Sequence, residues 1–328
     1  MVIAVVGLTA ATANADLWRR ASEGHAVDAV DERYDDAIAI GDALVTQAQA
    51  SSASITQIKK MLVQAEERYR AAAESKPESG EPYFRIAQML QHFFVDCHVL
   101  SNGIGPIVPA RTCDALHPST AVVKRMIDAW DQFEARSPLD PRVTNFLTER
   151  GIERTKLVEA DPKDRSLLEG ARKDYETFLA RSDGLTHGNL VVAWGNLAET
   201  YMMLGQLDDA IPAYQRAIRL GGGAEIAYGL AVALDRNDRG IEALSLVRDL
   251  GTNARISFEE AVTKNLVFYV PDGEIFYYLA LTEEAFGERA QALRSWRRYV
   301  TSGAHPEFQP RARAHIDALT RPTQGQRD

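Results

Sequence analysis

The chain has 328 residues, of which 45% are hydrophobic and 25% are charged, and its formal net charge at pH 7 is −9. This is the composition of an ordinary globular protein with enough apolar material for a buried core. The acidic balance argues against a nucleic-acid-binding protein, because such proteins normally present a basic face. We therefore expect no nucleic-acid partner.

The N-terminal segment differs from the rest of the chain. Residues 1–15 carry no charge, begin with an apolar run and end in Ala-Asn-Ala before Asp16. This pattern is typical of a secretory signal peptide, although no Lys or Arg precedes the run. The alternatives are a retained apolar N-terminus or a start further upstream. No other stretch approaches the roughly eighteen apolar residues of a membrane span. The sequence predicts an exported, periplasmic protein without a membrane span.

Helical periodicity follows this segment. One long or broken helix is predicted from Asp16 to about Gln49. Small and large apolar residues then recur at helical spacing in a helix that a proline ends, and a further helix opens directly after it. The residues that define these two helices are Ala65, Tyr69, Ala72 and Pro77, then Tyr83, Ile86, Ala87 and Leu90.

An insertion at about 95–118 interrupts this pattern and holds both cysteines, Cys97 and Cys113. An even number of cysteines in an exported protein favours a disulfide, which here closes a loop of about 15 residues and contributes roughly 3 kcal/mol. The competing hypothesis is a metal or haem site with His92, Cys97, Cys113 and His117 as ligands. Their spacing matches no strong zinc pattern. We therefore predict a Cys97–Cys113 disulfide, no metal and no cofactor.

Two helix pairs are indicated in the middle of the chain. Beyond the insertion, one helix is marked by Met126, Trp130 and Phe133, and it completes the pair that Tyr83 opens. The next pair consists of a first helix at about Arg142 to Leu157 and a second helix marked by Ala171, Tyr175 and Phe178. The clearest window then runs from 191 to 224 and contains two helices separated by Leu-Gly. Its periodic residues are Trp194, Leu197, Ala198 and Tyr201, then Ala210, Tyr214 and Ala217.

This window resembles the tetratricopeptide repeat, whose pattern is W-x2-L-G-x2-Y followed by A-x3-F and P. The pattern recurs at about 224–257, where Ala243 follows Ala210 by about 33 residues, and again at about 273–306 with Ala292 and Trp296. Six such matches make an unrelated helical bundle an improbable explanation. The resemblance implies an all-α, right-handed superhelical solenoid of helix pairs, in which each pair covers the apolar face of the next.

The predicted organisation has three parts. A signal peptide at 1–15 precedes a repeat domain at 16–320, and 321–328 is a disordered tail. The repeat domain has insertions at about 95–118 and 251–272. We expect the second insertion to hold an added helix near Ser257 to Asn265 and an apolar loop, Leu266 to Val270, that places aromatic residues against the solenoid. A last helix from Pro306 to Leu319 is expected to cap the array.

The resemblance also implies where a partner binds. In tetratricopeptide arrays the first helix of each pair lines the concave groove, and the corresponding positions here are mixed apolar and acidic. The family's carboxylate-binding clamp needs Lys, Arg and Asn, which are largely missing, so an apolar or basic segment is the better partner. The alternative is that the aromatic residues only pack between adjacent first helices. The predicted groove residues are Phe84, Gln88, His92, Glu199, Met202, Tyr228, Val232, Arg236, Tyr277 and Leu281, with Glu81, Gln91, Val192, Gly195, Met203, Glu225, Asp235, Glu274, Glu284 and Ala285 at further first-helix positions.

No catalytic motif is present. The sequence has no phosphate-binding loop, no G-x-G-x-x-G, no H-E-x-x-H and no G-x-S-x-G. His187 and His305 lie near predicted turns and are interpreted as exposed. We predict a non-enzymatic adaptor or scaffold that binds a protein or peptide partner. The alternatives are an assembly factor of an envelope complex, and a metal- or small-molecule-binding protein centred on the cysteine insertion.

Overall fold

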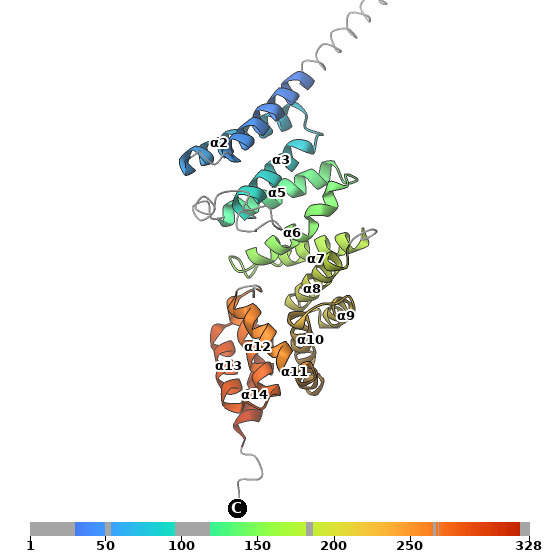
Figure 1. The fold of residues 1–328 in the computed structure, drawn as a ribbon, viewed down its shortest axis with the longest axis vertical. Helices are drawn as coiled ribbons and strands as arrows, with labels where there is room; N and C mark the ends of the chain where they lie inside the picture. Colours follow the sequence, from blue (N-terminus) through green and yellow to red (C-terminus); the bar gives the residue numbers. More distant parts are fainter. Residues whose placement is uncertain are drawn as a thin grey trace, which may run out of the picture. The chain divides into compact units, whose positions relative to one another are not determined.

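The computed structural model of the chain describes residues 30–49, 54–95, 119–181, 186–264, 267 and 269–321 (Figure 1). Every regular element in these ranges is a helix, and no described residue forms a strand, so the predicted all-helical fold is confirmed. The predicted signal peptide, the cysteine insertion with Cys97 and Cys113, and residues 322–328 lie outside the described residues. The chain divides into two compact units, Met1–Val143 and Thr144–Asp328.

The first unit contains helical residues 30–49 and the elements that follow them. These are α2 (Ile55–Ser75), α3 (Glu81–Leu90), the π-helical turn η1 (Gln91–Val95) and α5 (Thr120–Arg136). Ser54 starts α2 with a capping box, because its hydroxyl accepts from the Gln57 amide while its own amide donates to the Gln57 side chain. Helix α3 packs against both α2 and α5. The predicted small and large residues Ala65, Tyr69 and Ala72 are all buried in this packing.

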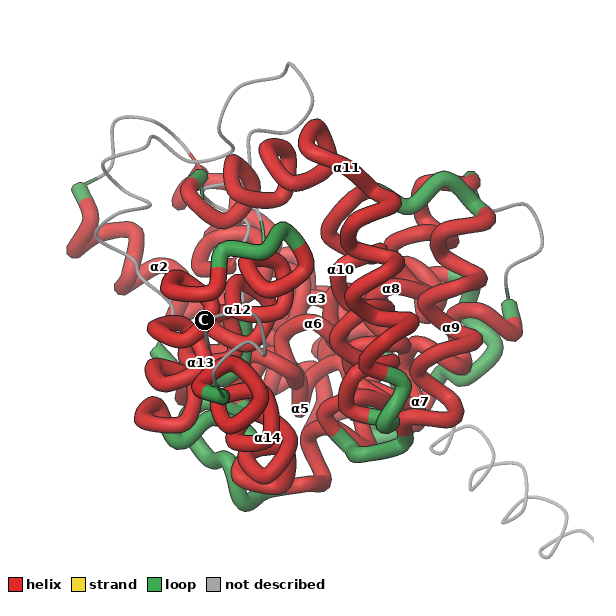
Figure 2. Tube along the Cα trace, turned by 90° about the horizontal axis from the view of Figure 1, so that it is seen from below, coloured by secondary structure: helices red, strands yellow, loops and turns green. Residues whose placement is uncertain are grey.

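The second unit is a succession of helices joined by short turns. They are α6 (Arg142–Leu157, beginning just before the boundary), α7 (Arg165–Ala180), α8 (His187–Met203), α9 (Leu207–Arg219), α10 (Ala224–Arg236), α11 (Gly240–Thr263), η3 (Asp272–Glu274), α12 (Ile275–Ala285), α13 (Arg289–Ser302), η4 (Pro306–Phe308) and α14 (Gln309–Thr320). From α7 to α14, each α-helix packs against the next one along the chain. Figure 2 shows α8 to α11 side by side. The predicted solenoid of helix pairs is therefore confirmed in this unit.

Alanines at equivalent positions allow the helices to approach closely. Each has no measurable exposure, so no larger side chain would fit without moving a neighbouring helix. They are Ala198, Ala210, Ala231, Ala243, Ala280 and Ala292. The large residues between them fill the space from one pair to the next, with Tyr214, Tyr277 and Trp296 each at most 2% exposed. These are the residue sizes that the repeat pattern predicts for a continuous core.

The second predicted insertion begins with an added helix, as expected, but this helix starts earlier than predicted. Gly251 has φ 76° and ψ 179°, a non-helical conformation that favours glycine, and it separates two helical segments within α11. The added helical segment runs from directly after Gly251 to Thr263, whereas the added helix was expected near Ser257 to Asn265. The predicted last helix is present as η4 and α14.

One helix contact gives a direct test of this packing. A Cβ atom at Gly229 in α10 would lie 2.5 Å from the Tyr214 ring of α9. We therefore expect Gly229→Ala to lower the free energy of unfolding by about 1–3 kcal/mol, despite the better helix propensity of alanine. Gly188→Ala in α8 is the matched control, because the nearest atom to its Cβ lies 3.9 Å away. That control should be neutral or stabilising by up to about 1 kcal/mol. Urea unfolding of both variants measures the difference, and equal effects would contradict the packing described.

Candidate binding site

A cavity of about 500 Å³ opens on the second unit. Its largest wall is α8, and α10 and α12 continue that wall along consecutive helix pairs. Residues from α6, α7, α9 and α11 and the irregular segment before η3 complete it. The lining residues that matter most for the chemistry are Val192, Glu199, Met203, Tyr214, Glu225, Ile226, Tyr269 and Tyr278. The cavity thus spans several repeats, as a groove on a helical array does.

Glu199 lies in this cavity between two tyrosines. The hydroxyls of Tyr214 and Tyr278 both donate to Oε2 of Glu199, the second at 3.2 Å. Burial raises the pKa of Tyr214 and of Tyr278 well above 10, so both hydroxyls keep their protons at neutral pH and can donate. Burial also raises the pKa of Glu199, and the hydrogen bond from Tyr214 opposes that effect. The cavity therefore holds a carboxyl group whose ionised form is supported by hydroxyl donors.

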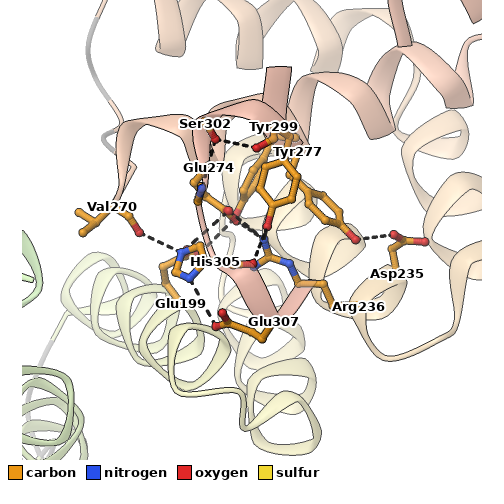
Figure 3. A network of polar contacts seen from close by, with 12 residues as sticks. Glu199, Asp235, Arg236, Val270, Glu274, Tyr277, Tyr299, Ser302, His305 and Glu307 are labelled. Carbon is orange, nitrogen blue, oxygen red and sulfur yellow. Dashed lines mark hydrogen bonds and ion pairs between the residues drawn. The ribbon is translucent and has the colours of Figure 1, made fainter. Parts of the chain in front are cut away.

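The irregular segment before η3 closes one side of the cavity. Tyr269 packs edge-on against Tyr278 of α12, with ring centroids 4.9 Å apart and planes at 61°. This is the arrangement expected of a loop that places an aromatic residue against the solenoid. The ring of His305 holds the segment, because its Nε2 lies 3.0 Å from the Val270 carbonyl oxygen (Figure 3). The prediction that His305 is exposed is wrong, since its side chain is only 11% exposed.

A buried polar network lies behind this wall (Figure 3). Arg236 of α10 donates two hydrogen bonds to the Glu274 carboxylate, at 2.6 and 2.8 Å, with both side chains almost fully buried. The Tyr277 hydroxyl donates to Asp235 at 2.7 Å. Because these contacts join α10 to η3 and α12, they fix the relative positions of two successive first helices. We assign this network a positioning role for the cavity walls.

The structure separates the predicted groove residues of the second unit into two groups. Glu199 lines the cavity, together with Val192, Gly195, Met203 and Glu225. Most of the other predicted positions are buried inside the helix stack instead, and the aromatic ones among them take the packing role that was the alternative. The buried group consists of Met202, Tyr228, Val232, Asp235, Arg236, Glu274, Tyr277, Leu281 and Ala285.

The predicted groove residues of the first unit are also divided. Gln88 and His92 line a smaller cavity of about 380 Å³, where His92 Nε2 lies 3.0 Å from the Gln49 side-chain nitrogen. Burial lowers the pKa of His92. Phe84 instead packs against Trp130 and Phe133 of α5, at centroid distances of 5.7 and 5.2 Å. It belongs to the helix contact and not to the cavity.

The aromatic half of the cavity in the second unit was not predicted from the sequence. Tyr214 and Tyr175 lie on second helices, and Tyr269 lies on the irregular segment, whereas the groove was predicted from first helices only. Tyr278 is on first helix α12, but its neighbour Tyr277 was chosen. The aromatic content of the second insertion was the one available indication.

The described residues contain neither a metal-binding cluster nor a helix that could span a membrane. No group of three or more His, Cys, Asp or Glu residues in the described ranges is arranged to hold a metal ion. The cysteine insertion lies outside those ranges, so its disulfide and its metal alternative both stay predictions. Among the described helices, none combines the length and apolar character needed to cross a bilayer.

Comparison with known proteins identifies one segment by family. Residues 191–221, which span most of α8, α9 and the turn between them, match the sequence model of the tetratricopeptide repeat. The chain is 32% identical over 143 residues to the cytochrome c-type biogenesis protein CycH of Rhizobium meliloti (strain 1021), a match that covers 44% of this chain and 33% of CycH. The chain thus matches about one third of the length of that curated relative.

Solved structures of repeat proteins are among the matches. A tetratricopeptide repeat protein from Parabacteroides merdae aligns over 88% of this chain and 100% of its own, with 12% identity and a TM-score of 0.34. Yeast Tom70 aligns over 87% of this chain and 64% of its own, with 14% identity and a TM-score of 0.26.

Proposed function

Because the chain is a tetratricopeptide repeat protein, we propose that it is a non-catalytic adaptor that holds a segment of a partner protein in the cavity of the second unit. The observation that carries this proposal is the cavity itself, whose walls come from helices of consecutive repeats. A partner segment laid along α8, α10 and α12 would contact several repeats at once. We place this activity in the periplasm, on the basis of the predicted signal peptide.

The lining of the cavity supports binding of a polypeptide. Val192 on α8 is 47% exposed, although it is a large apolar residue. Ile226 and Met203 add further apolar surface, and the tyrosine hydroxyls offer hydrogen bonds. Cavities with mostly apolar walls and a few oriented polar groups are the usual form of binding sites. The sequence has none of the catalytic motifs that would favour an enzyme.

The second candidate is an assembly factor for an envelope complex. The likeness to CycH, which is named as a cytochrome c-type biogenesis protein, favours this candidate and points to c-type cytochromes as the assembled product. Both candidates use the same cavity. They differ in the lifetime of the complex with the partner. An assembly factor built into a larger complex would co-purify with it stably, whereas an adaptor would release its partner.

A matched pair of surface variants tests the cavity. We expect Val192→Arg to abolish capture of the partner from envelope extract, because a long cationic side chain would fill the entrance. Ile256→Arg is the control, since Ile256 is a branched apolar residue with a similar exposure of 49% that does not line the cavity. Pull-down with purified protein, followed by identification of the captured chain, gives the comparison. Undiminished capture by folded Val192→Arg would show that the partner binds elsewhere.

A further inference from the structure

We infer that the cavity of the second unit is a subsite for a cationic side chain, Lys or Arg, which a partner segment inserts toward Glu199. This inference rests on the proposed function and specifies the chemistry of the partner. It is carried by the charges that line the cavity, by the ion pairs of the fully buried carboxylates in the same unit, which Glu199 lacks, and by the tyrosines that line the cavity with Glu199.

Both charged residues among the described residues of the cavity lining are acidic. They are Glu199 in the middle of α8 and Glu225, which is exposed in the first turn of α10. No Lys, Arg or His is among the described lining residues. A cation that enters therefore meets a carboxylate near the entrance and a second one among the tyrosines, and an anion would be repelled by both.

Glu199, which is half-buried at the cavity, lacks the cationic partner that the fully buried carboxylates of this unit have. Asp174 is paired with Arg150 and Arg154, at 2.5 and 3.1 Å. Among the described residues, no Lys, Arg or His nitrogen lies within ion-pair distance of Glu199, whose contacts are the two tyrosine hydroxyls on Oε2. Elsewhere in the unit, Asp235 is paired with Arg311 and His315, and Glu274 with Arg236.

This difference has a physical consequence. A carboxylate removed from water without a cation is costly to ionise, and burial accordingly raises the pKa of Glu199, while Tyr214, Arg236 and His305 offset the effect only in part. A ligand that brings its own positive charge supplies the missing pairing. A charge-assisted hydrogen bond contributes more to the binding free energy in such a partly desolvated site than the same hydrogen bond does at the surface.

The uncharged residues of the cavity lining suit both the cationic group and the methylene stem of a basic side chain. Tyr214, Tyr269 and Tyr278 surround the carboxyl group, and aromatic faces attract an ammonium or guanidinium group within about 6 Å. Ile226 and Val192 provide apolar surface for the methylene stem, which Lys and Arg commonly bury while the charge finds a polar partner. The site therefore matches both parts of a lysine or arginine side chain.

The probe for this inference is a random 12-residue peptide library displayed on phage, selected against the purified full chain. We expect wild type to enrich peptides with a Lys or Arg flanked by apolar residues, and Glu199→Gln to lose that preference. Glutamine keeps the shape and the oxygen that accepts from the tyrosines, so the variant should stay folded. Glu242→Gln is the control and should keep the preference, because Glu242 is an exposed carboxylate of α11 that does not line the cavity.

A binding titration with one enriched peptide measures how much its basic residue contributes to affinity. Replacing its basic residue with norleucine, which has no charge, should weaken binding to wild type about tenfold or more. The same replacement should change binding to Glu199→Gln by less than about threefold. This peptide-side comparison does not depend on the stability of any protein variant.

The outcomes separate this inference from the proposed function. Enrichment of apolar or acidic peptides that Val192→Arg fails to bind would overturn the cationic subsite and leave the adaptor function standing. Enriched peptides that Val192→Arg binds as well as wild type does would count against the cavity as the docking site. Failure to enrich any peptide would contradict both.

Discussion

Replacing Asp235 with asparagine is expected to lower the free energy of unfolding of the second unit by about 3–5 kcal/mol near pH 6. Asp235 is fully buried and joins three helices. It accepts from Tyr277 of α12 at 2.7 Å, from Arg311 of α14 at 2.6 Å and from His315 of α14 at 3.0 Å. Loss of its charge leaves buried donors and a buried cation without their main partner, which is the costly way to break an ion pair.

The pH dependence of this variant follows from His315. Burial lowers the pKa of His315, but hydrogen bonds to Asp235 and Glu284 raise it more, to about 9 from an ordinary value of 6.5. A raised pKa means that the stabilisation is complete below pH 6.5 and is lost as the pH rises through 9. The pKa of Asp235 is lowered to about 2 from 3.8, since His315 and Arg311 outweigh its burial, so its contribution is lost as the pH falls from 3.8 to 2.

These two shifts define the measurement. The cluster should stabilise the unit fully between pH 3.8 and pH 6.5, and the difference between wild type and Asp235→Asn should shrink toward pH 9. Urea unfolding at pH 5, 7 and 9 tests this. Asp238→Asn is the control, because Asp238 contacts the same Arg311 at 3.5 Å but its side chain is 92% exposed. Asp238→Asn should lower the free energy of unfolding by less than about 1 kcal/mol. A pH-independent difference for Asp235→Asn would contradict the role assigned to His315.

Arg236→Met is expected to lower the free energy of unfolding of the second unit by a similar amount of about 3–5 kcal/mol, because it leaves the buried Glu274 carboxylate without its cation. The guanidinium lies between the rings of Tyr277 and Phe308, 4.5 and 4.1 Å from their centroids, so the apolar stem of methionine fits the space that it vacates. Glu274→Leu alone should be equally costly, since it leaves Arg236 buried and unpaired.

The double variant distinguishes charge pairing from packing. Replacing both members of a buried ion pair with apolar residues of similar volume is often neutral or stabilising. We therefore expect Arg236→Met with Glu274→Leu to recover most of the stability that either single change loses. A double-mutant cycle in urea measures the coupling. If the two single losses simply add, the stabilisation comes from the packing of the side chains and not from their charges.

Much of the fold could be predicted because its determinants are local and repeated. The range predicted for the helix before Ala171, Arg142 to Leu157, coincides with α6. Ala210, Tyr214 and Ala217 recur on one face of a single helix, and a 3.6-residue period fixes that face without knowledge of the partner. The break at Gly251 coincides with the predicted start of the second insertion, but the added helix begins earlier than its predicted range because helical spacing alone does not mark its first turn.

The site was harder to predict because its contacts are long-range. A first helix has both a groove-facing side and a side packed against its neighbours, and Tyr277 and Tyr278 lie next to each other on different sides of α12. Tyr277 donates to Asp235, whereas Tyr278 faces the cavity. The pairing of Asp235 with His315 joins positions 80 residues apart, which a local periodicity does not encode. Burial of Arg236 likewise depends on Glu274, which lies 38 residues further along the chain.

Photo-cross-linking in intact cells is the most direct test of the adaptor function. p-Benzoylphenylalanine in place of Val192 would lie at the cavity, and the same group in place of Ile256 would lie at an equally exposed apolar position outside it. We predict a discrete adduct with one partner protein from position 192, carrying the cross-link in a segment with a Lys or Arg, and no such adduct from position 256. The absence of an adduct at 192, or the same adduct at both positions, would contradict the adaptor function proposed for this cavity.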